Sequence, residues 1–128
     1  MKKLHVETIK KENDHYIATV SEVIDKELAQ SLRAGERMLV DSDNLAFIYI
    51  LEDDTEFYYV NFSQKTWSDL KQLYTEAKKL ELILHEEVVI ELTSICEELS
   101  FLTENIEGNG NYGEEMEKAV QEVFAQHT

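Results

Sequence analysis

RMLVDSDNLAFIYILEDDTEFYYVNF, residues 37–62, is the most apolar and aromatic stretch of this 128-residue chain. Residues 45–51 are apolar at every position, and residues 56–62 are nearly so. Successive side chains of a strand point to opposite faces, so a run that is apolar on both faces is expected in the interior of a sheet. The stretch therefore predicts two neighbouring central strands.

A tight two-residue turn at Asp53-Asp54 would join these strands, although the glycine that such turns favour is missing. In that register Phe47 pairs with Val60. A slip of one residue would exchange the two faces, and because both faces are apolar the hydrophobic pattern fixes the register only weakly. The turn must therefore help to set the pairing.

Alternating patterns bounded by turn residues predict further strands at residues 3–10, 16–20 and 38–40, and one or two more between 80 and 92. Capping residues followed by apolar stripes predict helices that begin near Thr66, Ser94 and Asn111. Residues 22–33 stay ambiguous: their apolar side chains recur at four-residue spacing, which suits a short helix that Gly35 would end.

These elements predict an α+β fold in one domain that spans residues 1–128. We expect an antiparallel sheet of about five strands with three or four helices packed on one face. The last two helices are joined by a short connection that contains Gly108, so we expect them to form an antiparallel helical hairpin.

The composition indicates a cytoplasmic protein. A hydrophobic content of 43% is enough to bury a core, which argues against disorder. The single cysteine excludes an internal disulfide and suits a reducing compartment. No apolar run approaches the ~20 residues that a membrane-spanning helix needs, so we expect no membrane association.

The chain is strongly acidic, with a net charge of −15 and eleven glutamates between Lys79 and Lys118, where no Lys or Arg occurs. Because nucleic-acid binding requires neutralisation of phosphates, this charge argues against it. A solvated surface that keeps the protein soluble is the favoured explanation. A basic protein partner and mimicry of a nucleic acid stay open as alternatives.

Residues 108–113 read GNGNYG and match the Gly-x-Gly-x-x-Gly pattern of dinucleotide-binding loops. In those folds the motif follows a strand and precedes a helix whose N-terminus receives the pyrophosphate. Here a helix is expected before it, and Glu114-Glu115, which would repel phosphate, follow it. The glycines are better explained by a helix end and a sharp connection.

Asp41 and Asp43 follow an apolar strand, as the first carboxylates of phosphoaspartate phosphatases do. The lysine, the second acidic pair and the parallel sheet of those enzymes are not indicated. Read as an EF-hand, the segment places Leu45 and Ala46 at a ligand position and at the glycine position, so calcium binding is not supported. The Asp/Ser/Asn cluster is best explained as a turn.

Single residues give no stronger signal. Cys96 would lie in the first turn of a helix, which lowers the pKa of a thiol, but Glu97 and Glu98 act in the opposite direction. The four histidines show no metal-ligand spacing, and we expect no metal or cofactor.

Several short segments together resemble one family: residues 38–44, 46–47, 66–67, 91–93, 97–99, 105–106 and 111–113. The chain is similar to the YjbL-like group of small uncharacterised proteins from low-GC Gram-positive bacteria. The resemblance runs from about residue 35 to the C-terminus and extends loosely into the residues before that. It implies no known activity, so no catalytic residue is transferred from it.

We therefore expect a non-catalytic interaction or regulatory module with a protein partner or a homo-oligomeric state. An exposed sheet or helix face should then carry a contiguous apolar patch. The alternative is a small enzyme or a ligand- or metal-binding protein. Its candidate residues are Asp41, Asp43, Asn109, Asn111 and Tyr112.

Overall fold

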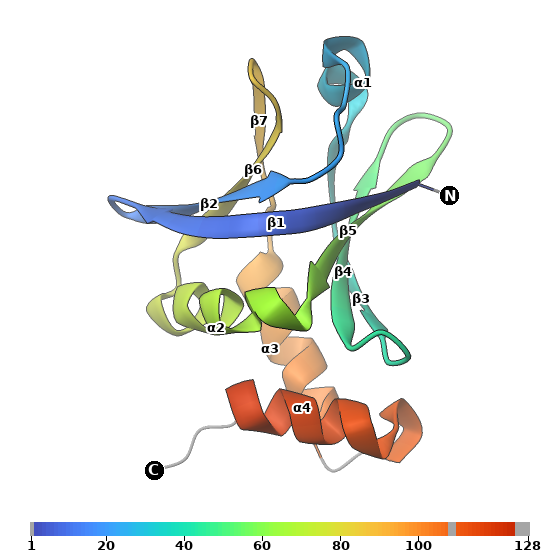
Figure 1. The fold of residues 1–128 in the computed structure, drawn as a ribbon, viewed down its shortest axis with the longest axis vertical. Helices are drawn as coiled ribbons and strands as arrows, with labels where there is room; N and C mark the ends of the chain where they lie inside the picture. The colour runs from blue at the N-terminus through green and yellow to red at the C-terminus, as the bar shows by residue number, and fades with distance from the viewer. Residues whose placement is uncertain (1, 108–109, 125–128) are drawn as a thin grey trace.

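A computed structural model describes residues 2–107 and 110–124. Seven strands form one curled sheet in the order β3-β4-β5-β1-β2-β6-β7 (Figure 1). The strands are β1 (Lys2–Glu12), β2 (His15–Val20), β3 (Arg33–Asp41), β4 (Ala46–Glu52), β5 (Phe57–Ser63), β6 (Lys79–His85) and β7 (Val88–Glu91). The helices are α1 (Lys26–Ser31), α2 (Trp67–Glu76), α3 (Ile95–Ile106) and α4 (Glu114–Phe124), with short 3₁₀ turns η1 (Gln64–Thr66) and η2 (Gly110–Tyr112).

The α+β class is confirmed, but the expected antiparallel sheet of about five strands is wrong. The sheet is mixed, because β1 lies parallel to β5 and β2 lies parallel to β6. The other four pairings are antiparallel. Hairpins leave a local turn signal in the sequence, whereas parallel neighbours are joined by long crossover connections that leave none.

The two central strands form where expected, with a different register. Phe47 pairs with Phe62 and not with Val60, which instead pairs with Tyr49. Relative to the prediction the pairing is displaced by two residues. Because side chains alternate with a period of two, this displacement leaves every side chain on its predicted face.

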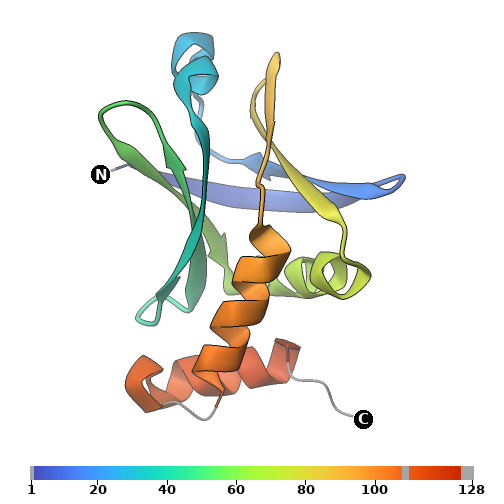
Figure 2. The same ribbon diagram turned by 180° about the vertical axis from the view of Figure 1, so that it is seen from behind.

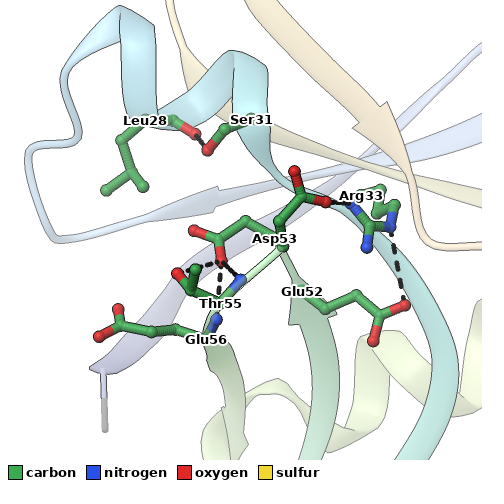
Figure 3. Close-up of polar contacts among 8 residues, drawn as sticks. Leu28, Ser31, Arg33, Glu52, Asp53, Thr55 and Glu56 are labelled. Atoms are coloured by element: carbon green, nitrogen blue, oxygen red, sulfur yellow. Dashed lines mark hydrogen bonds and ion pairs between the residues drawn. The ribbon is translucent and has the colours of Figure 1, made fainter.

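The turn between β4 and β5 explains the displacement, since it has four residues and not two (Figure 3). The backbone N of Asp53 donates to the carbonyl oxygen of Glu56 at 3.0 Å. The Asp53 carboxylate accepts from the backbone N of Thr55 at 2.8 Å and of Glu56 at 2.7 Å. The Asp53 side chain thus stabilises a loop that lacks the glycine of a two-residue turn.

Residues 22–33, which the sequence left ambiguous, contain the short helix α1, but Gly35 does not end this helix. Gly35 lies within β3, in an irregular part of the strand between Ala34 and Met38. A Cβ at Gly35 would lie 2.7 Å from the carbonyl oxygen of Ile50. Glycine is therefore needed here for the close approach of two strands.

The three longer helices form close to the predicted starts. Thr66 and Ser94 occupy the predicted N-cap positions of α2 and α3, but neither side chain makes the predicted capping hydrogen bond. Thr66 ends η1, and its hydroxyl donates to the carbonyl oxygen of Ser63 at 2.8 Å. Ser94 precedes α3 with a left-handed φ of 64°, and its hydroxyl donates to Glu36 at 3.0 Å. The Thr66 hydroxyl thus bonds to the preceding turn and the Ser94 hydroxyl to a distant strand, in place of the predicted capping bonds. The predicted cap at Gly108 lies outside the described residues.

α3 lies on the concave side of the curled sheet, between β3 on one side and β6 with α2 on the other (Figure 2). The two edge strands, β3 and β7, also contact each other. α4 runs across the C-terminal end of α3 (Figures 1 and 2), so the predicted antiparallel hairpin of the last two helices is wrong. Among the described residues, no helix is long and apolar enough to span a membrane.

An aromatic cluster joins the sheet to α2 and α4. Phe47 and Trp67 are fully buried, and their ring centroids lie 5.0 Å apart. Phe124 packs against both rings, at 5.7 Å from Phe47 and 5.9 Å from Trp67. The indole N–H of Trp67 donates to the carbonyl oxygen of Phe62 at 3.0 Å, so the buried polar atom is satisfied. The aromatic cluster thereby anchors α2 and α4 to one face of the sheet.

Candidate functional site

The candidate site lies on the opposite, outer face of the same strands. Phe47, Tyr49, Val60 and Phe62 are fully buried and belong to the hydrophobic core. The residues that alternate with them on β4 and β5 must point to the other face. That outer face includes half-exposed Phe57.

Four apolar side chains from three adjacent strands share the outer face, and we call them the outer-face patch: Leu39, Ile48, Phe57 and Tyr59. Leu39 pairs with Ile48 across β3 and β4. Buried Ile50 lies next to Ile48 along β4 and pairs with Tyr59, so it links the two halves of the patch. Leu39 is 47% exposed and Phe57 is 48% exposed. The patch therefore presents large apolar side chains to solvent.

Basic side chains border the patch, although the chain as a whole is acidic. The Arg37 guanidinium lies 5.7 Å from the ring centroid of Phe57, within the range of a cation–π contact. Lys3 pairs with Tyr59 across β1 and β5. Neither Arg37 nor Lys3 makes an ion pair with any residue in the ranges 2–107 and 110–124.

Two acidic side chains, Glu52 on β4 and Glu22 beside β1, have partners of their own. Glu52 lies 3.8 Å from the guanidinium of Arg33 (Figure 3). Glu22 lies 2.6 Å from Nδ1 of His5, and it also accepts from the His5 backbone N. The positive charges of Arg37 and Lys3 are therefore not neutralised at short range.

A buried amide lies at the centre of this face. Asn61 is 8% exposed, and its Oδ1 atom has no hydrogen-bond partner among the described residues. It pairs with Ile48 on one side and with His5 on the other. An unsatisfied buried acceptor costs about 1–3 kcal/mol, and such groups are rare in folded proteins.

The structure places the predicted residue Asp41 at the end of β3 and Asp43 in the β3–β4 turn. The Asp41 carboxylate accepts from the Asn44 side chain at 2.9 Å and from its backbone N at 3.3 Å. The prediction that this cluster stabilises a turn is confirmed for Asp41. Asp43 is exposed to solvent.

The other half of the predicted ligand site lies in and beside η2. Asn111 and half-buried Tyr112 belong to this turn, whereas Asn109 lies outside the described residues. Figure 1 shows η2 and the β3–β4 turn toward the same end of the molecule. The glycine motif follows α3, a helix, as the sequence indicated. Binding of a ligand by these residues stays a prediction.

Other polar groups have structural roles. Glu76 at the end of α2 joins Lys11 at 3.0 Å and the Tyr16 hydroxyl at 3.1 Å. The hydrogen bond from Lys11 is the main cause that lowers the pKa of Glu76. A shallow hollow beside α1 is lined by Asp25, Glu27, Leu28 and Ser31, but Asp25 caps the helix there and Ser31 bonds back to it.

The thiol of Cys96 is half-buried at the start of α3. Burial raises the pKa of the Cys96 thiol, and the charge of Glu97 raises it further. The Cys96 Sγ lies 3.5 Å from the carbonyl oxygen of Lys78. No group of three His, Cys, Asp or Glu side chains in residues 2–107 and 110–124 could hold a metal ion.

The glutamates between Lys79 and Lys118 are distributed over β6, β7, α3, α4 and the turns beside them. Some have local partners, such as Glu81 with His15 and Glu87 with Lys26. A protein that mimics a nucleic acid needs its carboxylates in a continuous ribbon, spaced like phosphates. The distribution of these glutamates does not support such mimicry.

Comparison with known protein families gives a clear assignment. UPF0738, described as a family of unknown function, matches residues 4–124. The chain belongs to the UPF0738 family. The UPF0738 protein BH2850 of Halalkalibacterium halodurans is 44% identical over 98% of this chain and 100% of its own length. A Geobacillus member is 45% identical over 96% of this chain and 97% of its own.

The UPF0738 protein YjbL of Bacillus subtilis is 48% identical to this chain over 69% of it and 71% of its own length. The resemblance to a YjbL-like group of low-GC Gram-positive bacteria is thus confirmed. No solved structure matches the chain.

Sequence reasoning found the strands of this UPF0738 member and expected an apolar patch on an exposed sheet or helix face, but it did not locate the patch. The apolar pattern on both faces of residues 45–51 and 56–62 was a signal, because helices on one side leave the second face uncovered. The contact between Arg37 and Phe57 had no such signal, since β4 separates their strands in the sheet.

Proposed function

We propose that this UPF0738 protein is a non-catalytic, cytoplasmic interaction module and that the outer-face patch is its protein-binding surface. The observation that carries the proposal is the half-exposed pair Leu39 and Phe57, joined by Ile48 and Tyr59 on adjacent strands. Exposed apolar patches of this kind mark interaction sites in soluble proteins.

The composition of the patch supports the proposal. Tyr, Phe and Arg are enriched at protein interfaces, and Arg37 already lies over the Phe57 ring. A stacked guanidinium is partly held in place before binding, so less conformational entropy is lost when a partner arrives.

Asn61 provides a second, polar argument. Its Oδ1 atom is unsatisfied in the isolated chain. A partner that donates a hydrogen bond to this face would remove the cost of that group, after a small movement of the side chains that cover it. Such a polar contact within an apolar patch would also give specificity.

The position of the patch is suited to binding. β4 and β5 are interior strands of the sheet, flanked by β3 and β1. Side chains on paired strands are held more precisely than those on loops, which favours a preformed binding surface.

A site-specific photo-crosslinking experiment tests the proposal. A photoreactive phenylalanine analogue replaces Phe57 in one variant and fully exposed Val23 in a control variant, in cells that encode a UPF0738 protein. We expect a defined protein adduct at position 57 that is absent at position 23 and is lost on Leu39→Ser. Identical adducts at the two positions, or none at position 57, would rule out the patch as a binding surface.

A further inference from the structure

The exposed face of α3 carries an aromatic side chain among carboxylates. Phe101 is 64% exposed, because α3 turns a different stripe toward the core. Glu97 precedes Phe101 by four residues and Glu104 follows it by three, so both share its helical face. Both glutamates are exposed. We call Phe101, Glu97 and Glu104 the α3 ridge.

The α3 ridge and the outer-face patch are complementary in chemistry. The ridge presents one apolar side chain flanked by negative charges. The patch presents apolar side chains bordered by Arg37 and Lys3, which make no ion pair with the described residues. Placing Phe101 on the patch would bring opposite charges together around an apolar centre, the arrangement that gives interfaces their specificity.

We infer that the partner of the outer-face patch is a second copy of this chain, which docks through its α3 ridge. The inference rests on the proposed function, because it names the partner of the same surface. A net charge of −15 makes two copies repel each other unless basic groups of one meet acidic groups of the other. Arg37 and Lys3 provide that meeting point.

The two surfaces differ, so the contact joins Phe101 of one copy to Phe57 of another. A two-fold dimer would make this contact twice, and an open assembly would make it once between successive copies. In both cases a copy without the patch can still offer its ridge, and a copy without the ridge can still offer its patch. This asymmetry makes the inference testable by mixing variants.

Sedimentation velocity of the full chain over a range of concentrations is the test. Phe57→Ser removes the centre of the patch, and Phe101→Ser removes the centre of the ridge. Both side chains are exposed, so the fold should persist, as circular dichroism would verify. Val23→Ser, which touches neither surface, is the matched control.

We expect the wild-type chain and Val23→Ser to associate, and each single variant to associate at least about tenfold more weakly, as loss of an interface anchor commonly causes. An equimolar mixture of the two variants should restore a complex between them. Arg37→Glu should weaken association as well.

Three outcomes would overturn the inference: a wild-type chain that stays monomeric, variants that associate as well as the wild type, or variants whose mixture forms no complex. If the chain is monomeric while position 57 still crosslinks to a different protein, the second-copy inference fails and the proposed function stands. If position 57 crosslinks to nothing as well, both fail.

Discussion

The carboxylate of Glu98 in α3 accepts a hydrogen bond from the backbone N of Met38 in β3, at 2.8 Å. Met38 follows the irregular segment of β3 that begins after Ala34. A helix side chain thereby satisfies a donor on an edge strand of the sheet. The contact ties α3 to β3 at the place where Ser94 also bonds to Glu36.

Removing this carboxylate should destabilise the fold. Glu98→Ala leaves a partly buried amide without its acceptor, which costs about 1–3 kcal/mol. Glu97→Ala is the matched control, because Glu97 also lies in the first turn of α3 but is exposed. Urea unfolding at low protein concentration should show a lower midpoint for Glu98→Ala only. Equal losses in both variants would mean that the helix terminus, and not Met38, is responsible.

Gly35 should not tolerate a side chain. In Gly35→Ala the new Cβ would lie 2.7 Å from the carbonyl oxygen of Ile50, a backbone atom that cannot move away cheaply. We expect a loss of about 1–3 kcal/mol, typical of overpacking. Gly110→Ala is the control, since no atom of the described residues lies within 4 Å of its Cβ position. Thermal unfolding of both variants checks the prediction. An unfolding temperature of Gly35→Ala equal to that of the wild type would contradict the close approach of Gly35 to Ile50.

Ala77 is a site where glycine should be better than the native residue. It ends α2 with a left-handed φ of 55°, a conformation that costs an L-residue about 1–2 kcal/mol. Ala77→Gly removes that cost but makes the unfolded chain more flexible, so a net gain of about 1 kcal/mol or less is expected. Ala77→Val should lose stability instead. Denaturant unfolding of the two variants should therefore shift in opposite directions.

Acid should weaken the contact between Glu76 and Lys11. The folded-state pKa of Glu76 is below the ordinary value of 4.5, mainly because of the hydrogen bond from Lys11. A carboxyl group whose pKa is lowered by folding stabilises the folded state at pH values above its pKa in the unfolded chain. This stabilisation disappears as the pH falls through the pKa of the group in the folded chain. The stability difference between wild type and Glu76→Gln should shrink from neutral pH to about pH 3. Exposed Glu107→Gln serves as the control, and a pH-independent difference would contradict the prediction.

Cys96 should react slowly with alkylating reagents. Burial raises its thiol pKa, with a further contribution from Glu97, so little thiolate is present at neutral pH. We expect slower labelling by iodoacetamide than of free cysteine, faster labelling as the pH rises, and full reactivity after unfolding in urea. Rapid labelling of the native protein would show that the thiol is activated, contrary to this environment.

Local patterns were enough to place most strands. The alternation in residues 3–10 and 16–20 and the apolar runs at residues 45–51 and 56–62 all correspond to strands. The strand at residues 38–40 was predicted too short, because β3 continues back to Arg33 through the irregular segment around Gly35. Such a segment has no periodic pattern to detect.

The candidate site was less accessible to sequence reasoning. The two-sided apolar pattern indicated strands with both faces apolar, but it could not show which face the helices would leave exposed. Residues 41–43 were noticed because Asp-x-Asp is a recognisable motif. Phe101 was not noticed, because a single aromatic residue outside the apolar stripe of α3 forms no pattern.

The sequence by itself determined the α+β class, the two central strands, the faces of their side chains and the family, because these depend on residue periodicity and on residue identity. Only the tertiary structure decided the parallel pairing of β1 with β5 and of β2 with β6, the four-residue turn at Asp53, and the contact of Arg37 with Phe57. Each of these joins segments through space or through specific hydrogen bonds, and such non-local contacts leave no periodic trace along the chain.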